Sequence, residues 1–242
     1  MAGESGIVAI SNNSFKSVVY NQISIIATEG YTAYDKQTKR PIVKFSPTDT
    51  LKIGIGSNGF VLSVNNKVLA KNTGTIVLDC PIGLLGVENL KRNGKQSFYH
   101  GVLEITPKNS ASFYVVNVVE LQNYLKGVVP NEMPVRFGIE ALKAQAIAAR
   151  NYVLMPRTRS SREFDVDDSV SSQVYFGAGT ESELSNKAVN ETEGLVALYG
   201  WDLILAQYSS TAGGYTENYS NAFSDPKTKE FPAKTKPYLK PL

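Results

Sequence analysis

The sequence predicts an α+β protein: a β-rich N-terminal half with short hairpins, continuous with a mixed half built round one long amphipathic helix. Short runs of β-branched and aromatic residues, separated by Gly, Asn and Pro, fill the chain from residue 7 to about 118. From Val119 onward, apolar residues recur at spacings of three and four, which is typical of a helix packed along one side. The 242 residues suffice for one large domain or two modest ones with a hydrophobic core.

The first region, which we place at residues 1–98, is expected to form short strands joined by tight turns. Asn65-Asn66 suits a two-residue hairpin turn because Asn tolerates positive φ. Residues 54–59 fit the Gly-x-Gly-x-x-Gly dinucleotide fingerprint, but that motif needs a helix after it, and strand-like residues follow here. A glycine-rich turn is therefore the better interpretation. The strands expected up to residue 118 are 18–28, 42–45, 51–55, 60–64, 67–70, 75–78, 97–106 and 112–118.

The second region, which we place at residues 99–242, contains the expected helices. A short one at 121–128 ends at Pro130, and the long one follows Pro134, runs to about Leu154 and stops at Pro156. After a loop of mixed charge, a third helix is expected at 186–193, with Gly194 as its C-terminal cap. Residues 195–199 and 202–209 then suggest a hairpin that turns at Gly200-Trp201.

Composition and charge limit the partners and the kinds of catalytic site that this chain can have. The net charge is +3 and the pI about 8.8, without a dense basic block, so an anionic polymer is an acceptable partner while nucleic acid is disfavoured. Cys80 is the only cysteine, which excludes an intramolecular disulfide and a thiolate metal cluster. The only histidine, His100, lies in a strand-like stretch and is expected to be a partly buried strand residue. Acid–base chemistry would then fall to Asp, Glu, Lys or Tyr.

The ends of the chain carry little targeting information. The first ten residues lack the basic and apolar segments of an export signal, and no apolar run reaches membrane-spanning length. Taken alone, these features indicate a soluble intracellular protein, although Met1-Ala2-Gly3 is equally compatible with a start placed after a removed export signal.

Glu132 lies between Pro130 and Pro134, in what we expect to be a short connector between two helices. A carboxylate held there by rigid backbone can serve as a general acid. It can equally be an acidic residue placed favourably near a helix N-terminus. On the long helix, Lys143 and Arg150 share one face, and charged residues on an amphipathic helix usually form its solvated side.

Four segments in this order give the chain a family resemblance: YLKGVVPNEMP (124–134), EALKAQAIAAR (140–150), QVYFG (173–177) and STAGGYTE (210–217). Together they resemble the stage II sporulation protein D/LytB amidase-enhancer family, whose members act on bacterial cell-wall glycan. The resemblance covers about Tyr99 to Leu239 well and the N-terminal half only loosely.

For the sporulation members the resemblance implies a lytic transglycosylase, with Glu132 as the catalytic acid. Such an enzyme cleaves the bond from N-acetylmuramic acid to N-acetylglucosamine in peptidoglycan and leaves a 1,6-anhydro product. One carboxylate would do both proton transfers, unlike the carboxylate pair of ordinary glycosidases, and burial would raise its pKa. Arg150 and Lys143 would orient the sugar or stabilise developing charge. The expected sugar contacts are Gln145, Gln173, Tyr175, Ser209, Ser210 and Thr216, with Gly213 and Gly214 allowing close backbone approach.

The sequence departs from the family pattern in two ways. Some members carry Cys and His before Gln-Val-Tyr as apparent metal ligands, whereas this chain has Asp165, Asp167 and Asp168 there, so we expect an acidic loop without zinc and no cofactor. The family also usually continues past Leu242, so the chain looks C-terminally truncated.

Two other functions are compatible with the same residues: a non-catalytic amidase enhancer that binds glycan while a cell-wall amidase cuts peptide, and a structural wall protein with a degenerate cleft. All three functions imply peptidoglycan glycan strands as the partner. The resemblance accordingly implies an extracytoplasmic or wall-associated location.

Overall fold

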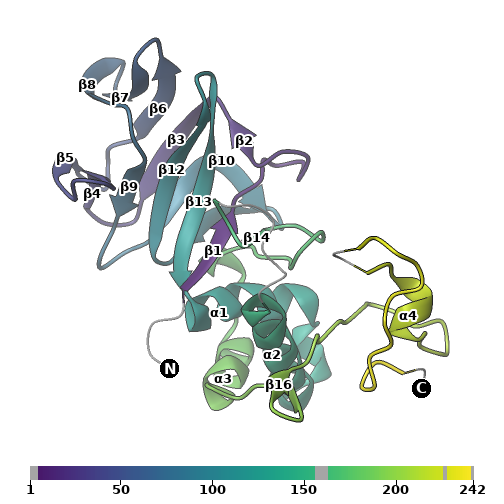
Figure 1. Ribbon diagram of the computed structural model, residues 1–242. Coiled ribbons are helices and arrows are strands. Elements are labelled where there is room, and N and C mark those ends of the chain that lie inside the picture. The colour runs from purple at the N-terminus through teal and green to yellow at the C-terminus, as the bar shows by residue number, and fades with distance from the viewer. Residues whose placement is uncertain (1–4, 156–162, 226–227, 241–242) are drawn as a thin grey trace.

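The computed structural model describes residues 5–155, 163–225 and 228–240. Two β-sheets, built largely from the N-terminal half, lie at one end of the molecule, and the helices α1 (Leu121–Glu132), α2 (Ile139–Leu154) and α3 (Glu183–Glu191) gather at the other (Figure 1). One hydrophobic core joins residues of both sheets with residues of these helices. The predicted fold class, α+β with a β-rich N-terminal half, is confirmed.

The larger sheet, sheet A, has eight strands, and its neighbouring strands are antiparallel except for the parallel pair β1 and β14. The short strand β2 (Val19–Tyr20) pairs with part of β13. The remaining strands follow the order β14 (Val166–Asp167), β1 (Ser5–Ala9), β13 (Ser112–Glu120), β12 (Val102–Asn109), β9 (Ile76–Asp79), β4 (Tyr31–Asp35) and β5 (Pro41–Phe45).

The second sheet, sheet B, has six antiparallel strands. Their order is β11 (Lys95–Tyr99), β10 (Leu85–Arg92), β3 (Gln22–Ala27), β6 (Leu51–Gly56), β7 (Gly59–Val64) and β8 (Lys67–Asn72). The hairpin of β7 and β8 turns at Asn65 and Asn66, which both have positive φ, as predicted. The glycine-rich motif at 54–59 forms the turn of the β6–β7 hairpin, also as predicted.

Two expected strands are each divided between the sheets. Residues 18–28 form β2 in sheet A and β3 in sheet B, and residues 97–106 form β11 in sheet B and β12 in sheet A. At the second break Gly101 has a φ of 74°, and a Cβ there would collide with the Val118 carbonyl oxygen, so only glycine fits this turn.

Strands β1, β4 and β10 were not expected from the sequence. The pattern of β10 is obscured by an irregularity in its pairing with β11, where Asn89 adopts a positive φ of 60°. The proposed boundary at residue 99 stays a prediction, and sheet A contains strands from both sides of it.

The helices follow the predictions closely except at their ends. Helix α1 does not end at Pro130 but continues to Glu132, so Glu132 lies in the last helical turn and not in a connector. Pro130 lacks an N–H, yet the Met133 N–H reaches the Val129 carbonyl at 3.0 Å and completes that turn. Helix α2 is as predicted, while the expected stop at Pro156 falls outside the described residues.

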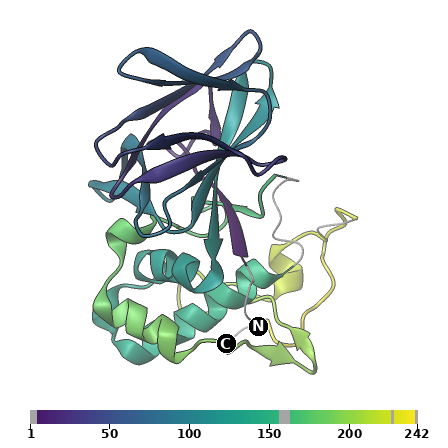
Figure 2. The ribbon, with the colours of Figure 1, turned by 90° about the vertical axis from the view of Figure 1, so that its left-hand side faces the viewer.

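Helix α3 begins earlier than expected because Ser182 and Ser185 form a capping box at its start. Gly194 is not its cap but follows in the next turn, with a φ of 72°. The expected hairpin is present but shorter, as β15 (Leu198–Tyr199) and β16 (Asp202–Leu203). The short helix α4 (Tyr219–Ala222) belongs to the C-terminal segment, which stands apart from α1, α2 and α3 in Figure 1. The turned view again shows the sheets at one end of the molecule and these three helices at the other (Figure 2). Within the described residues, no helix has the length and apolar character required to cross a bilayer.

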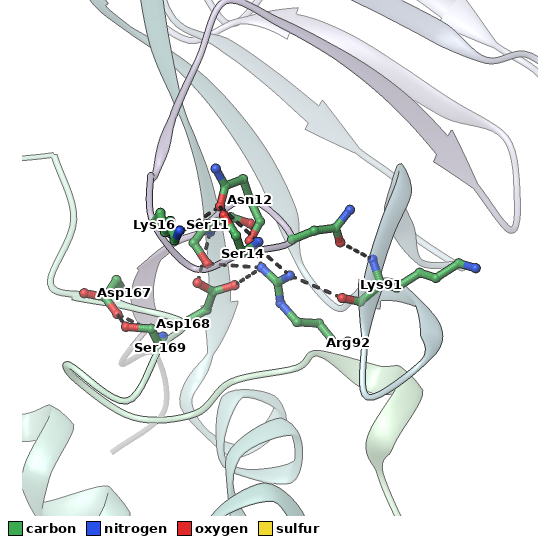
Figure 3. Close-up of polar contacts among 10 residues, drawn as sticks. Ser11, Asn12, Ser14, Lys16, Lys91, Arg92, Asp167, Asp168 and Ser169 are labelled. Carbon is green, nitrogen blue, oxygen red and sulfur yellow. Dashed lines mark hydrogen bonds and ion pairs between the residues drawn. The ribbon is translucent and has the colours of Figure 1, made fainter.

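A buried ion pair ties both sheets to the segment that leads into the site. Arg92, at the end of β10, donates through Nη2 to Asp168 Oδ2 at 2.6 Å and to the Ser11 carbonyl at 2.6 Å (Figure 3). The Ser11 N–H donates to the other Asp168 oxygen at 3.0 Å. The guanidinium also lies 4.3 Å from the centre of the Phe15 ring. Asp168 directly follows β14, so this cluster anchors the chain just before residue 173.

Candidate functional site

Glu132 is held at the end of α1 by a neighbouring segment of backbone. Its Oε1 accepts a hydrogen bond from the Val174 N–H at 2.7 Å. The segment is fixed against α1 because the Phe176 N–H donates to the Gly127 carbonyl at 3.3 Å. Gly127 permits this approach, since a Cβ there would lie 2.6 Å from the Tyr175 ring. The carboxylate is half-buried as a result.

Tyr208 approaches Glu132 from another part of the chain, the stretch after β16. Its hydroxyl lies close enough to the Glu132 carboxyl to oppose the rise that burial causes in the pKa of that group, and burial and the charge of Glu132 in turn raise the pKa of Tyr208. The same hydroxyl accepts a hydrogen bond from Gln173 Nε2 at 2.9 Å. Tyr208 itself is partly buried.

Gln173 links these groups to the helices. Its side chain is fully buried, its Oε1 accepts from the Tyr124 hydroxyl at 2.9 Å, and its Nε2 also donates to the Ala149 carbonyl at 3.3 Å. Helices α1 and α2 and the stretch around residue 208 therefore meet at Gln173, the residue before the one that donates to Glu132. The structure brings Gln173, one of the other predicted site residues, next to the segment that holds Glu132.

The pKa of Glu132 is set by burial and by two neutral donors. Burial raises the pKa of the Glu132 carboxyl, and the Val174 N–H and the Tyr208 hydroxyl partly oppose that rise. Among the described residues, no Lys, Arg or His contributes to the pKa of this carboxyl. Burial also raises the pKa of Tyr208, with the negative charge of Glu132 adding to the effect, so Tyr208 stays a neutral hydroxyl. The site is therefore suited to holding a proton on a carboxyl group.

Arg150 is not beside Glu132, contrary to expectation. Its side chain is buried, and Nη1 donates to the Leu195 carbonyl at 2.9 Å while Nη2 donates to Gln122 Oε1 at 3.3 Å. Gln122 and Glu132 lie at opposite ends of α1, about 15 Å apart at a rise of roughly 1.5 Å per residue. A buried guanidinium is stable only when hydrogen-bond acceptors surround it, and the Leu195 acceptor lies where α2 packs on the turn after α3. The arginine joins these elements together.

Lys143 also lies away from Glu132, on the outer side of α2. It pairs with Glu191 of α3 at 2.8 Å and with Glu140 at 2.9 Å. These two partners, Glu191 first, raise the pKa of its ammonium. The solvated-face interpretation of this position is therefore the better one.

Tyr175, an expected sugar contact, is a core residue. Its side chain is fully buried, its hydroxyl donates to Asn117 Oδ1 at 2.8 Å, and its ring centre lies 5.0 Å from that of Tyr124. It has no surface to offer a ligand. Gln145 is also buried, but it lies next to Tyr208 at the site. Its Nε2 makes no hydrogen bond with any described residue, so this amide is a better candidate for a substrate contact.

The other expected contacts lie on the exposed stretch that follows Tyr208. Ser209 and Ser210 come directly after it in the chain, and the Ser209 hydroxyl donates to the Thr211 carbonyl at 3.3 Å, whereas Thr216 donates to the Lys240 carbonyl at 3.4 Å. Gly213 and Gly214 have φ values of 61° and 105°, which other residues rarely adopt. Their backbone is exposed, as a close approach to a polymer requires.

Sequence reasoning missed the groups that surround Glu132. Tyr208 and Tyr124 were not predicted, and neither was Asn131, whose amide donates to the Gly127 carbonyl at 2.7 Å and to Thr180 Oγ1 at 2.8 Å. The sequence feature that pointed to Tyr208 was its place in the chain, immediately before the predicted sugar contacts Ser209 and Ser210. Only the fold shows that its hydroxyl reaches α1.

The aspartates before Gln173 do not gather into a ligand set. Asp168 is committed to Arg92, and Asp167 accepts from the Ser169 N–H at 2.9 Å. In the described residues, no three His, Cys, Asp or Glu side chains are grouped so that they could hold a metal ion. His100 lies at the break between β11 and β12 and contacts Glu181 at 2.9 Å.

With this geometry in view, the chain can be compared with known proteins. Residues 109–199, from the end of β12 to β15, match the family described as Stage II sporulation protein. This stretch contains Glu132 and Gln173. The resemblance to the stage II sporulation protein D/LytB family is confirmed.

Individual relatives extend the likeness. The chain is 47% identical to the Amidase enhancer of Bacillus subtilis over 100 residues, which cover 41% of this chain and 13% of that protein. It is 38% identical to Stage II sporulation protein D of Bacillus amyloliquefaciens over 128 residues, 46% of this chain and 37% of that one. An uncharacterised protein of Brachyspira hyodysenteriae is 32% identical over 197 residues, 80% of this chain and 50% of that one. The matches thus span half or less of each relative.

Proposed function

We propose that the protein acts on the bacterial cell wall as a lytic transglycosylase that cleaves the bond from N-acetylmuramic acid to N-acetylglucosamine in peptidoglycan. The observation that carries this proposal is Glu132: a half-buried carboxyl with a raised pKa, held by the Val174 N–H and Tyr208, with no cation contributing among the described residues. A carboxyl of this kind stays protonated closer to neutral pH than an exposed one, as a general acid must.

The proposed reaction uses Glu132 twice. Protonated Glu132 donates its proton to the bridging glycosidic oxygen, and the bond from that oxygen to C1 of the muramic residue breaks. The 6-hydroxyl oxygen of the same residue then attacks C1, and the Glu132 carboxylate takes up the proton of that hydroxyl. The product is a 1,6-anhydro end, Glu132 returns to its protonated form, and no water is consumed.

The second candidate function is a non-catalytic amidase enhancer that binds glycan strands while a cell-wall amidase cuts peptide. It is favoured by the 47% identity to a protein named Amidase enhancer, the highest identity among the relatives described above. The exposed backbone at Gly213 and Gly214 and the hydroxyls of Ser209 and Ser210 suit glycan binding under either function.

Glu132→Gln separates the two functions. The amide keeps the size of the carboxyl and can still accept from the Val174 N–H, but it cannot donate and recover a proton. We expect the original protein to release soluble fragments with anhydro-muramic ends from insoluble glycan, as detected by mass spectrometry. Glu132→Gln should reduce that release about 10²–10⁴-fold while the protein still sediments with the glycan.

Other outcomes would contradict the proposal. Fragments with reducing ends would mean hydrolysis, and release that survives in Glu132→Gln would remove Glu132 from the catalytic role. Sedimentation with glycan and no release by the original protein would favour the amidase-enhancer function.

A further inference from the structure

We propose that Tyr208 is a positioning residue for Glu132, oriented by Gln173 so that its hydroxyl hydrogen points at the carboxylate. This inference rests on the proposed acid–base role of Glu132 and adds the group that stabilises its charged form. Three hydrogen bonds of Gln173, with Tyr124 of α1, with Ala149 of α2 and with Tyr208, carry the inference, together with the closeness of Tyr208 to Glu132.

The orientation of the Gln173 amide comes first. Its side chain is fully buried between α1 and α2, and the Ala149 carbonyl oxygen lies 3.3 Å from Nε2. A backbone carbonyl can only accept, so the NH₂ end of the amide must face Ala149. The carbonyl end then faces Tyr124, whose hydroxyl donates to Oε1 at 2.9 Å. Reversing the amide would place two acceptors against each other in the core.

The direction of the Tyr208 hydroxyl follows. The second hydrogen of Gln173 Nε2 donates to the Tyr208 oxygen at 2.9 Å. Since that oxygen is already an acceptor, its own hydrogen is free to point elsewhere. The side chains of Glu132 and Gln145 both lie close to it, and the charged carboxylate of Glu132 is the stronger acceptor. The hydroxyl is therefore a donor toward Glu132. The hydrogen bond that the Tyr208 oxygen accepts from the Gln173 amide also polarises the O–H bond and strengthens its donation.

Glu132 thus has two donors fixed by adjacent residues. The Val174 N–H donates directly at 2.7 Å, and Gln173, the residue before it, directs Tyr208. In the part of the chain that the structure describes, the ionisable side chains that interact with the carboxylate or with Tyr208 are tyrosines: Tyr124 on α1, Tyr208, and Tyr152 of α2 beside Tyr208. Neutral donors stabilise the carboxylate after it has given up its proton, without the strong bias against protonation that a lysine or arginine would impose.

The experiment compares Tyr208→Phe with Tyr175→Phe. Both changes remove one hydroxyl from a tyrosine ring in the same half of the molecule, but the Tyr175 hydroxyl donates to Asn117 and not to Glu132. The titration of Glu132 is followed by NMR in protein labelled with ¹³C at the Glu side-chain carboxyl, and the Glu132 signal is assigned by its loss in Glu132→Gln.

We expect Tyr208→Phe to raise the pKa of Glu132 above that of the original protein, because the charged form loses a donor, and Tyr175→Phe to leave it unchanged. Glycan cleavage should fall about 10-fold in Tyr208→Phe, the effect of one hydrogen bond to a charged group. An unchanged or lowered Glu132 pKa in Tyr208→Phe would overturn the inference, as would an equal rise in Tyr175→Phe. Absence of cleavage by the original protein would instead contradict the proposed function, since the titration does not depend on turnover.

Discussion

The buried pair of Arg92 and Asp168 allows a test of how burial changes the contribution of an ion pair to stability. The side chains of Arg92 and Asp168 are 1% and 0% exposed and approach to 2.6 Å. The pair of Lys36 and Glu104 has the same 2.6 Å separation, but its side chains are 54% and 12% exposed. The two pairs therefore differ chiefly in their access to water, which makes one a matched control for the other.

Asp168→Asn keeps the size of the side chain but leaves the Arg92 charge buried without its counter-ion. Breaking a buried pair on one side typically costs about 3–5 kcal/mol. Arg92 would keep the Ser11 carbonyl at 2.6 Å and the Phe15 ring at 4.3 Å, so we expect the lower end, about 3 kcal/mol. For a chain of this length that loss lowers Tm by roughly 6–12 °C. Glu104→Gln should cost about 1 kcal/mol or less.

Equilibrium unfolding in urea, followed by far-UV circular dichroism, measures both costs. A third variant, Arg92→Met with Asp168→Leu, removes both charges together and should recover most of the loss, because no uncompensated charge remains in the core. The reasoning is refuted if Asp168→Asn costs no more than Glu104→Gln. It is also refuted if the double replacement is no more stable than Asp168→Asn.

Three further predictions follow from the corrected positions and from the pKa of Glu132. Arg150→Gln should lower the urea midpoint, because it removes the hydrogen bond to the Leu195 carbonyl. The kcat for glycan cleavage by the folded protein should stay within about twofold of the original value. A tenfold fall in kcat would show that Arg150 takes part in catalysis. Lys143→Ala should leave both the urea midpoint and kcat unchanged, because its ion pairs lie at the solvated surface, and a clear loss of kcat would contradict that placement. The raised pKa of Glu132 means that the folded state favours the protonated form of this carboxyl. The protonated carboxyl therefore contributes fully to stability below about pH 4.5, and this contribution is lost as the pH rises through the pKa of Glu132 in the folded state. The urea midpoints of the original protein and of Glu132→Gln should therefore converge at low pH and separate toward pH 7, where the variant should be the more stable. A difference in midpoint that does not depend on pH would show that folding does not shift the pKa of Glu132.

Features that depend on local pattern could be predicted from the amino-acid sequence. Apolar spacing in residues 139–154 predicts α2 because one face of a helix repeats every three or four residues. The Asn65-Asn66 and Gly200-Trp201 turns are encoded by the few residues that accept positive φ at little cost. Glu132 was singled out by its place between two prolines and by four segments that resemble a known family. These signals are local or lie in the order of motifs along the chain.

Which side chains meet depends on how the helices, strands and loops pack together. Arg150 and Lys143 share a helix face in the sequence pattern, yet one is buried against Leu195 and the other pairs with Glu191 at the surface. Tyr175 belongs to the core, whereas Tyr208 reaches Glu132. The physical reason is that a buried polar group must find its hydrogen-bond partners in space, among segments that packing has brought together. Spacing along the chain cannot specify those partners, because Glu132, Gln173 and Tyr208 come from separate segments that become neighbours only when the helices and loops have packed.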